Sequence, residues 1–301
     1  MLTVLVTSSR VAPGLLTWQA WDLLRSADAV IAPPGHPLLP VLAEAGVACQ
    51  VARVPPPAAD SGDSVVWLAP AGSAEIPAGA QVVPGSADLP GAHLLDLVVV
   101  MDRLRAQCPW DAQQTHLTLV PHLIEEPYEA LEALESGDME AFAEELGDVL
   151  LQVVFHARIA DSFGIDDVAD GIVEKLVRRH PHVFGTVQVA DAEEVKRNWD
   201  AIKKQERAER AVVPDSGKVI PSALDGVPFG QPALALSAQL QRRAERGGVP
   251  ESLVQLDGDA GLGAELFRLV ASARAAGLDP ELELRAAARR YDERVRAWEH
   301  D

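Results

Sequence analysis

The residues in this sequence that are best suited to chemistry are carboxylates at helical spacing. Residues 106–157 contain no Lys or Arg but eleven acids. The acids are Asp111, Glu125, Glu126, Glu129, Glu132, Glu135, Asp138, Glu140, Glu144, Glu145 and Asp148. Residues three apart on a helix share one face. Two subsets therefore each present a carboxylate pair, namely Glu125-Glu126-x-x-Glu129 and Glu145-x-x-Asp148.

Apolar stripes accompany both subsets and predict that the acids lie near the seam between two helices. The stripes are Leu123, Ile124 and Leu131 on the first helix, and Leu146, Val149 and Leu150 on the second. Two unit charges 4 Å apart repel by roughly 4 kcal/mol at an effective dielectric constant of 20. The acids must therefore be protonated, turn outward as an ordinary solvated face, or bind a hard cation. All-oxygen ligation without His or Cys favours Mg²⁺ or Mn²⁺ over zinc.

Basic residues follow the acidic stretch and have the chemistry that a polyphosphate requires. Lys175, Arg178 and Arg179 come first, and Trp199 and Lys203 follow on a further helical segment. Divalent cations bridge phosphate oxygens, while guanidinium and ammonium groups neutralise the remaining charge. The competing interpretation of the two arginines is a solvated helix end that complements the helix dipole. We interpret the nearby His180-Pro181-His182 as a structural turn.

The elements that must position these side chains are helices that follow a smaller α/β unit. Strand-like runs occur at residues 2–7, 29–32, 49–54, 64–68 and 81–83, and helical spacing at 15–27 and 38–45. From His93 onward, apolar residues recur at helical intervals. We expect an α/β domain at 1–91, a catalytic helical domain at 92–212 and a degenerate helical repeat at 213–301, with Ala211 to Gly230 as a linker.

Composition and charge exclude several classes of protein. The chain has 301 residues, of which 48% are hydrophobic and 24% charged, as in ordinary globular proteins. Its formal net charge of −19 disfavours binding to nucleic-acid polymers or anionic membranes. Cys49 and Cys108 have no metal-ligand spacing. We find no signal peptide and no membrane span, and expect a reduced, cytoplasmic protein.

A series of motifs in the central part resembles the MazG nucleoside triphosphate pyrophosphohydrolases. The series covers about a hundred residues in one order, which makes it highly specific. It consists of Cys108-Pro-Trp-Asp111, Gln114-Thr-His116, the EExxE at 125–129, Glu145-Leu-Gly-Asp148, Val154-Phe-His-Ala157, Lys175 to Gly185 and Asn198-Trp199.

The resemblance implies an all-α bundle that uses Mg²⁺ to cleave nucleoside triphosphates to the monophosphate and pyrophosphate. The implied metal ligands are Glu126, Glu129, Glu145 and Asp148, and Glu125 is a candidate for orienting the attacking water. The implied nucleotide contacts are Lys175, Arg179, Trp199 and Lys203, with the Cys108 to His116 segment near the base or ribose. Pro127 departs from the motif and predicts a kink between Glu126 and Glu129.

The C-terminal part resembles a decayed second copy of the same motifs. Gly261-Leu-Gly-Ala264 stands where Glu145-Leu-Gly-Asp148 stands in the first copy. The second copy lacks both acids, so we expect it to hold no metal and to serve as packing or dimer surface. Bundles of this type are often completed by a partner chain, which predicts a homodimer. The alternative is that the second repeat supplies the missing helices internally.

The N-terminal unit resembles, more faintly, the start of the tetrapyrrole methylases. Leu15-Leu-Thr17, Ala27-Asp-Ala-Val30 and His36-Pro37 carry the likeness. Thr7-Ser-Ser-Arg10 replaces the glycine-rich turn that these methylases need after their first strand, and the unit is under half the expected length. We therefore expect a truncated unit without methyl transfer.

Two other functions compete with the pyrophosphohydrolase. A di-iron carboxylate protein also places acids on facing helices, but it uses Glu-x-x-His pairs, and His122 and His156 are at the wrong offsets. A non-catalytic nucleotide-binding regulatory or scaffold protein is favoured by one decayed repeat and one degraded domain. We expect the enzyme, acting on NTPs or dNTPs in house-cleaning of the nucleotide pool.

Overall fold

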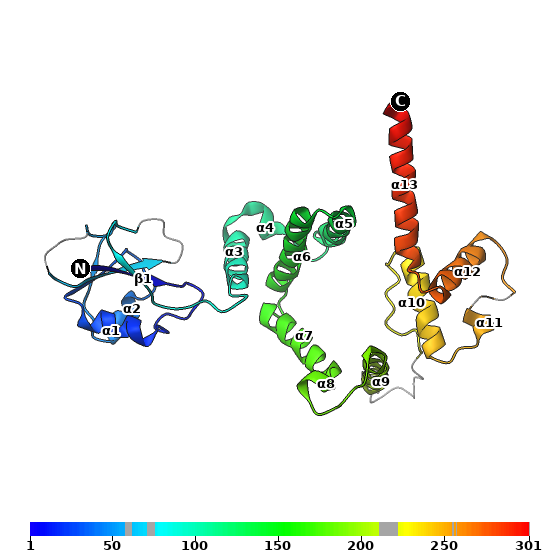
Figure 1. Ribbon diagram of the computed structural model, residues 1–301, viewed down its shortest axis with the longest axis horizontal. Coiled ribbons are helices and arrows are strands. Elements are labelled where there is room, and N and C mark those ends of the chain that lie inside the picture. Colours follow the sequence, from blue (N-terminus) through cyan, green and yellow to red (C-terminus); the bar gives the residue numbers. More distant parts are fainter. Residues whose placement is uncertain (58–61, 71–75, 211–221, 255, 257, 301) are drawn as a thin grey trace. The chain divides into compact units, whose positions relative to one another are not determined.

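A computed structural model describes the chain except for residues 58–61, 71–75, 211–221, 255, 257 and 301 (Figure 1). The chain divides into two compact units, Met1–Glu174 and Lys175–Asp301, and each is described by itself. The first part of the expected linker and the expected boundary at 212/213 lie outside the described residues. The division into three domains therefore stays a prediction.

The first unit begins with a parallel sheet, which in the described part of the chain has five strands in the order β3-β2-β4-β1-β5. The strands are β1 (Leu2–Thr7), β2 (Ala29–Ala32), β3 (Cys49–Val51), β4 (Val65–Pro70) and β5 (Gln81–Pro84), with helices α1 (Trp18–Ser26) and α2 (Leu39–Glu44). In the sheet, Leu5 lies opposite Leu68 and Val83. All three are buried in one cluster with Leu24 of α1 and Leu42 of α2.

The small α/β unit is thus confirmed, with differences at the ends of its elements. The third strand ends at Val51 rather than Val54, and α1 begins at Trp18 rather than Leu15. The side chain of Thr17 accepts a hydrogen bond from the backbone N–H of Ala20 and so caps the helix. Residues 15–17 are therefore outside the helix, although their spacing is compatible with it.

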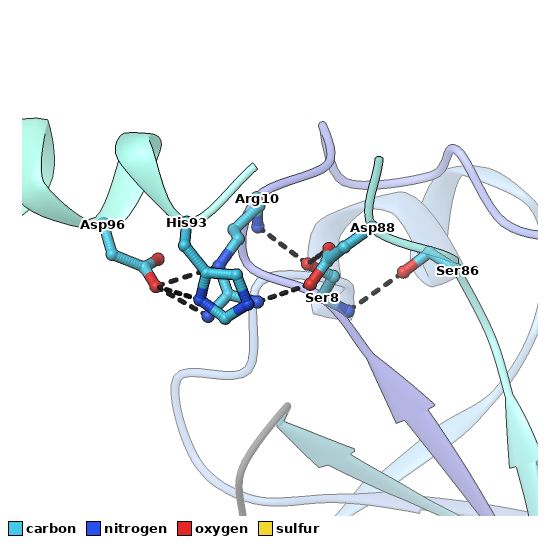
Figure 2. A network of polar contacts seen from close by, with 6 residues as sticks. All are labelled: Ser8, Arg10, Ser86, Asp88, His93 and Asp96. Carbon is cyan, nitrogen blue, oxygen red and sulfur yellow. Dashed lines mark hydrogen bonds and ion pairs between the residues drawn. The ribbon is translucent and has the colours of Figure 1, made fainter. Parts of the chain in front are cut away.

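A polar network joins the loop after β1 to the start of the first long helix, α3 (Leu94–Gln107) (Figure 2). The Arg10 guanidinium forms ion pairs with Asp88 and with Asp96 on α3, and its Nε lies 2.9 Å from the Asp96 Oδ2. Ser8 donates a backbone hydrogen bond of 3.0 Å to the Ser86 hydroxyl. The Ser-Ser-Arg sequence that replaces the expected glycine-rich turn thus connects the sheet to the helical part.

The helical part of the first unit is built around a helical hairpin (Figure 1). Its members are α5 (Val120–Ser136) and α6 (Met139–Ile159), and α3 and the short α4 (Pro109–Gln113) precede them. Gly137 adopts a φ of 79° at the end of α5, and the Asp138 side chain accepts from the N–H groups of Glu140 and Ala141. Met101, Leu119, Val154 and Phe155 form the buried core.

The second unit is also helical in its described residues. Helix α7 (Ile165–Arg179) runs into it and is followed by α8 (Pro181–Phe184), α9 (Ala192–Arg210), α10 (Ala233–Arg246), α11 (Glu251–Val254), α12 (Leu262–Ala275) and α13 (Pro280–His300). The Gln241 amide on α10 donates a 2.7 Å hydrogen bond to the Phe267 carbonyl on α12. Arg274 on α12 forms an ion pair with Glu245 on α10. Among the described residues, no helix is long and apolar enough to cross a bilayer.

Candidate active site

The helical hairpin brings together three of the acids that the sequence singles out. Glu126 and Glu129 on α5 and Glu145 on α6 each offer a carboxylate oxygen, and these oxygens lie within 4.8 Å of one another. Glu126 and Glu145 are half-buried, while Glu129 is exposed. The three side chains therefore converge, so this part of the acidic face differs from a set of separately solvated carboxylates.

The electrostatics of the cluster show that its charge is poorly compensated. Burial raises the pKa of Glu126 above its ordinary value, and the charges of Asp148 and Glu129 raise it further. The pKa of Glu145 is raised by the same causes, with burial first, then Glu129, then Asp148. Asp148 thus acts on both glutamates, although it is outside the group of three converging oxygens. Each shift has the sign expected for carboxylates that repel one another.

The donor set fits a hard divalent cation. Mg²⁺ and Mn²⁺ prefer oxygen ligands, and the oxygens of Glu126, Glu129 and Glu145 are close enough to face one ion. Helix α5 continues through Pro127 from Val120 to Ser136, and Glu126 and Glu129 still reach the same cluster. The assignment of these residues and Asp148 as ligands stays a prediction.

Glu125 lies apart from the converging oxygens. Its side chain is 62% exposed, and one carboxylate oxygen lies 3.6 Å from the Nδ1 atom of His122, one helical turn earlier. This position leaves Glu125 accessible to water beside the cluster. The expected role of Glu125 in orienting the attacking water stays a prediction, and the exposure of its carboxylate is compatible with that role.

The basic residues form a second cluster, which lies in the second unit. Arg178 and Arg179, at the end of α7, both pair with Glu206 on α9 at 2.8 Å and 2.6 Å. Hydrogen bonding from Arg179, followed by that from Arg178, lowers the pKa of Glu206 to about 2. Lys175 is half-buried on the same helix as the arginines.

Trp199 and Lys203 extend this basic cluster along α9. The Lys203 ammonium lies 4.8 Å from the centre of the Trp199 ring. His180 packs edge-on against Trp199 at 4.9 Å, and its Nδ1 donates a 2.6 Å hydrogen bond to the Leu176 carbonyl. Because the Leu176 carbonyl is an acceptor, Nδ1 must carry the proton. His180 therefore closes the end of α7, in agreement with a structural turn.

The segment from Cys108 to His116 lies against α5 and α6. Trp110 packs edge-on against Phe155 of α6 and His122 of α5, and Asp111 is buried. His116 and His156 stack with their Nδ1 atoms 2.8 Å apart. Burial and the charge of His116 lower the pKa of His156. The two histidines can share one proton, because one ring must donate and the other accept.

Sequence reasoning missed two residues that the structure places near these groups. Glu206 lies seven positions after Trp199 on α9, and that helical spacing was the available signal. Gln152 is buried on α6, four positions after Asp148 and so close to it in angle around the helix. An uncharged residue inside an apolar stretch gives no sequence signal that sets it apart from its neighbours.

Comparison with known proteins identifies the family. Residues 114–184 match the MazG nucleotide pyrophosphohydrolase domain. A nucleoside triphosphate pyrophosphohydrolase from Mycolicibacterium smegmatis is 37% identical over 253 residues, which cover 81% of this chain and 72% of that protein. The nucleoside triphosphate pyrophosphohydrolase/pyrophosphatase MazG of Thermotoga maritima is 37% identical over 228 residues, covering 68% of this chain and 84% of that protein.

A further relative matches this chain over a larger share of its own length than these two relatives do. It is an uncharacterized 26.1 kDa protein of Streptomyces cacaoi, 47% identical over 245 residues, which cover 79% of this chain and 95% of the relative. The matched domain spans α5, α6 and α7, where the converging glutamates lie. The chain belongs to the MazG family of nucleoside triphosphate pyrophosphohydrolases.

Proposed function

We propose that the protein hydrolyses NTPs or dNTPs to the nucleoside monophosphate and pyrophosphate with Mg²⁺, and that Mn²⁺ can replace it. The observation that carries this proposal is the convergence of Glu126, Glu129 and Glu145 within 4.8 Å. The names of the relatives support the same activity. A bound divalent cation would supply charge neutralisation at the phosphates and a lowered pKa for an attacking water.

The acidic residues hold the cation and position the attacking water. Glu126, Glu129, Glu145 and Asp148 provide the oxygen ligands, and the exposed carboxylate of Glu125 accepts a hydrogen bond from the attacking water. A bond forms between the water oxygen and the α-phosphorus. The bond from the α-phosphorus to the oxygen that bridges it to the β-phosphorus breaks. The water loses its proton to a nearby carboxylate, and pyrophosphate leaves with the electron pair.

The basic residues bind the departing pyrophosphate in this scheme. Lys175, Arg178, Arg179 and Lys203 would neutralise the charge that develops on it, and Trp199 would contact the nucleotide. Glu206 accepts hydrogen bonds from both Arg178 and Arg179. It thereby restricts their rotamers before a phosphate arrives, which reduces the entropy lost on binding.

A homodimer is part of the proposal. Leu123 and Ile124 on α5 and Leu146 on α6 are 43%, 54% and 48% exposed, so these apolar side chains are open to a partner. A second copy would cover this face and complete a bundle. We further propose that the protein acts in the cytoplasm in clearing unwanted nucleotides, and the free thiols of Cys49 and Cys108 suit a reducing compartment.

The proposed second repeat would serve as packing or dimer surface. Gly261 precedes α12 with a φ of 105°, whereas its counterpart Glu145 lies inside α6. Ala264, the counterpart of Asp148, is buried. Neither position offers a carboxylate, so we place the chemistry in the first repeat alone.

The test is to incubate purified protein with each NTP and dNTP in Mg²⁺ and to measure pyrophosphate and orthophosphate separately. The proposal expects pyrophosphate and the nucleoside monophosphate in equal amounts. Orthophosphate without pyrophosphate would reject the position of attack. Nucleotide binding without any product would favour the regulatory or scaffold protein.

A further inference from the structure

Two histidines meet where the turn before α5 contacts helix α6. His116 lies in that turn, which covers residues 114–119, and His156 lies near the end of α6. Their rings are nearly parallel, with an interplanar angle of 3°, and their Nδ1 atoms are 2.8 Å apart. Neither residue belongs to the proposed cation site or to the basic cluster. The contact is thus a connection between the turn and α6 that the proposed mechanism does not use.

The turn leads directly into the helix that carries two of the converging glutamates. Inside the turn, the Thr118 hydroxyl donates a 2.8 Å hydrogen bond to the Gln114 Oε1 atom. Helix α5 begins at the next residue after the turn, Val120, and presents Glu126 and Glu129 to the cluster. A displacement of the turn from α6 therefore reaches the first residues of this helix.

The contact between the two rings depends on their protonation. In the neutral pair, one Nδ1 atom carries a proton and donates it, and the other accepts. When both rings are protonated, two N–H groups face each other across 2.8 Å, so the hydrogen bond is lost and two positive charges repel. The His156 Nε2 atom is enclosed and has no hydrogen-bond partner among the described residues, so a proton placed there finds no acceptor.

The surroundings of the pair also favour the neutral rings. Burial, followed by the charge of His116, lowers the pKa of His156. The neighbouring elements carry Arg105 (α3), Asp111 (α4), His122 and Glu125 (α5) and Arg158 (α6). Arg158 pairs with Asp102 of α3, and His122 with Glu125. In the part of the chain that the structure describes, no carboxylate is among the causes of the shift in the pKa of His156, so a second positive charge on the pair has no counter-charge.

We propose that His116 and His156 form a pH-sensitive lock, which holds the turn on α6 while at least one ring is neutral and releases it in acid. His116 is exposed and exchanges protons with the solvent directly. Release of the turn loosens the start of α5 and thereby lowers activity, and neutral pH restores it. This effect on activity rests on the proposed function, whereas the lock itself does not.

The test is hydrogen–deuterium exchange of the turn in the full chain from pH 7.5 to 5.0, corrected for the intrinsic effect of pH on exchange. A group with a lowered folded pKa contributes stability above its ordinary pKa, roughly 6.5 for histidine, and that stability is lost as the pH falls through the folded value. We expect protection of the turn to fall by roughly tenfold in acid, about the effect of losing one hydrogen bond. The glutamate cluster acts in the opposite direction, because acid relieves its repulsion.

Two substitutions at position 116 separate charge from hydrogen bonding. His116→Gln can still bond to the Nδ1 atom of His156 but cannot be charged, so protection of its turn should change by less than about twofold over the same range. His116→Lys is charged throughout, so its turn should be released already at pH 7.5. The matched control is His93→Gln, because His93 lies outside the turn and pairs with Asp96 at 3.7 Å. This variant should respond to pH like the unaltered protein.

The outcomes separate the lock from the proposed function. Protection of the turn that is independent of pH, or that falls equally in His116→Gln, would overturn the lock, as would a simultaneous loss of protection in β1, which reports unfolding of the whole unit. If the turn is released but pyrophosphate release falls no more in acid than it does in His116→Gln, the effect on activity is wrong. Absence of pyrophosphate from every nucleotide at pH 7.5 would reject the proposed function, and exchange would still decide the lock.

Discussion

Glu126 on α5 and Glu145 on α6 each place a carboxylate oxygen within 4.8 Å of the other across the helical hairpin. Gly137 and Asp138, which end one helix and begin the next, set the geometry of the connection. Burial, followed by the charges of neighbouring carboxylates, raises the pKa of both glutamates. This relationship underlies most of the predictions below.

Replacing one member of the cluster should remove activity and leave the fold intact. We expect Glu126→Gln to lower pyrophosphate release by about 100-fold or more, since it removes a ligand and a charge at the site of transition-state stabilisation. Its thermal midpoint without metal should not fall, because repulsion is relieved. Glu140→Gln, an exposed residue in the first turn of α6, is the control and should keep its activity. Normal turnover by Glu126→Gln would exclude Glu126 from the site.

The metal-free protein should lose stability as the pH rises through the titration of the cluster. A carboxyl whose folded pKa is above its unfolded value binds its proton more tightly in the folded state. Its stabilising contribution is complete below the unfolded glutamate pKa of roughly 4.3 and is lost as the pH passes through the raised folded pKa. Thermal midpoints measured from pH 4 to 8 should show this decline, and Glu126→Gln should reduce it. An identical dependence of the thermal midpoint on pH in Glu126→Gln would show that the titration of Glu126 does not contribute to the decline.

The ion pairs of Glu206 should contribute to stability over the whole neutral range. Arg179 and Arg178 lower its pKa to about 2, so its contribution is present above the ordinary glutamate pKa and is lost only as the pH falls through about 2. Glu206→Gln should lower the free energy of unfolding by about 1–2 kcal/mol at pH 7, as expected for charge-assisted hydrogen bonds near the surface. Denaturant unfolding measures this change. An unchanged midpoint and slope would show that the pairs contribute nothing.

Much of the fold follows from local sequence patterns. The buried, nearly continuous apolar runs of β1 and β4 predict strands, and the helical spacing around Leu146 and Leu150 predicts α6. The ends of elements depend on single contacts, such as the hydrogen bond from the Ala20 N–H to Thr17. Hydrophobic spacing does not report such contacts, which is why α1 begins later than expected.

The acidic half of the site could be predicted better than the remainder. Glu126 and Glu145 are close because helical spacing and a short turn restrict where their side chains can lie. The pairing of Glu206 with Arg179 joins α9 to α7, with α8 between them in the chain, and neither residue's local pattern specifies that contact. Gln152 is buried and lines a cavity together with residues of α3, α4 and α5, an arrangement that only the tertiary structure shows.

Restoring acids to the proposed second repeat should not create a second metal site. In Gly261→Glu/Ala264→Asp, the glutamate would have to adopt the positive φ of 105° at Gly261, and the aspartate would enter a buried position. We expect a loss of about 2–4 kcal/mol in unfolding free energy from the two effects. Calorimetric titration with Mg²⁺ should give the same number of sites as the unaltered protein. One additional site would contradict the assignment of this repeat to packing.

The most direct test of the account is a crystal structure with Mn²⁺ and a non-hydrolysable nucleoside triphosphate, in which anomalous scattering locates the metal. We predict that the anomalous density places the metal where carboxylate oxygens of Glu126, Glu129, Glu145 and Asp148 coordinate it, next to the phosphates. Density elsewhere, with these four carboxylates turned toward bulk water while nucleotide is bound, would contradict the central claim.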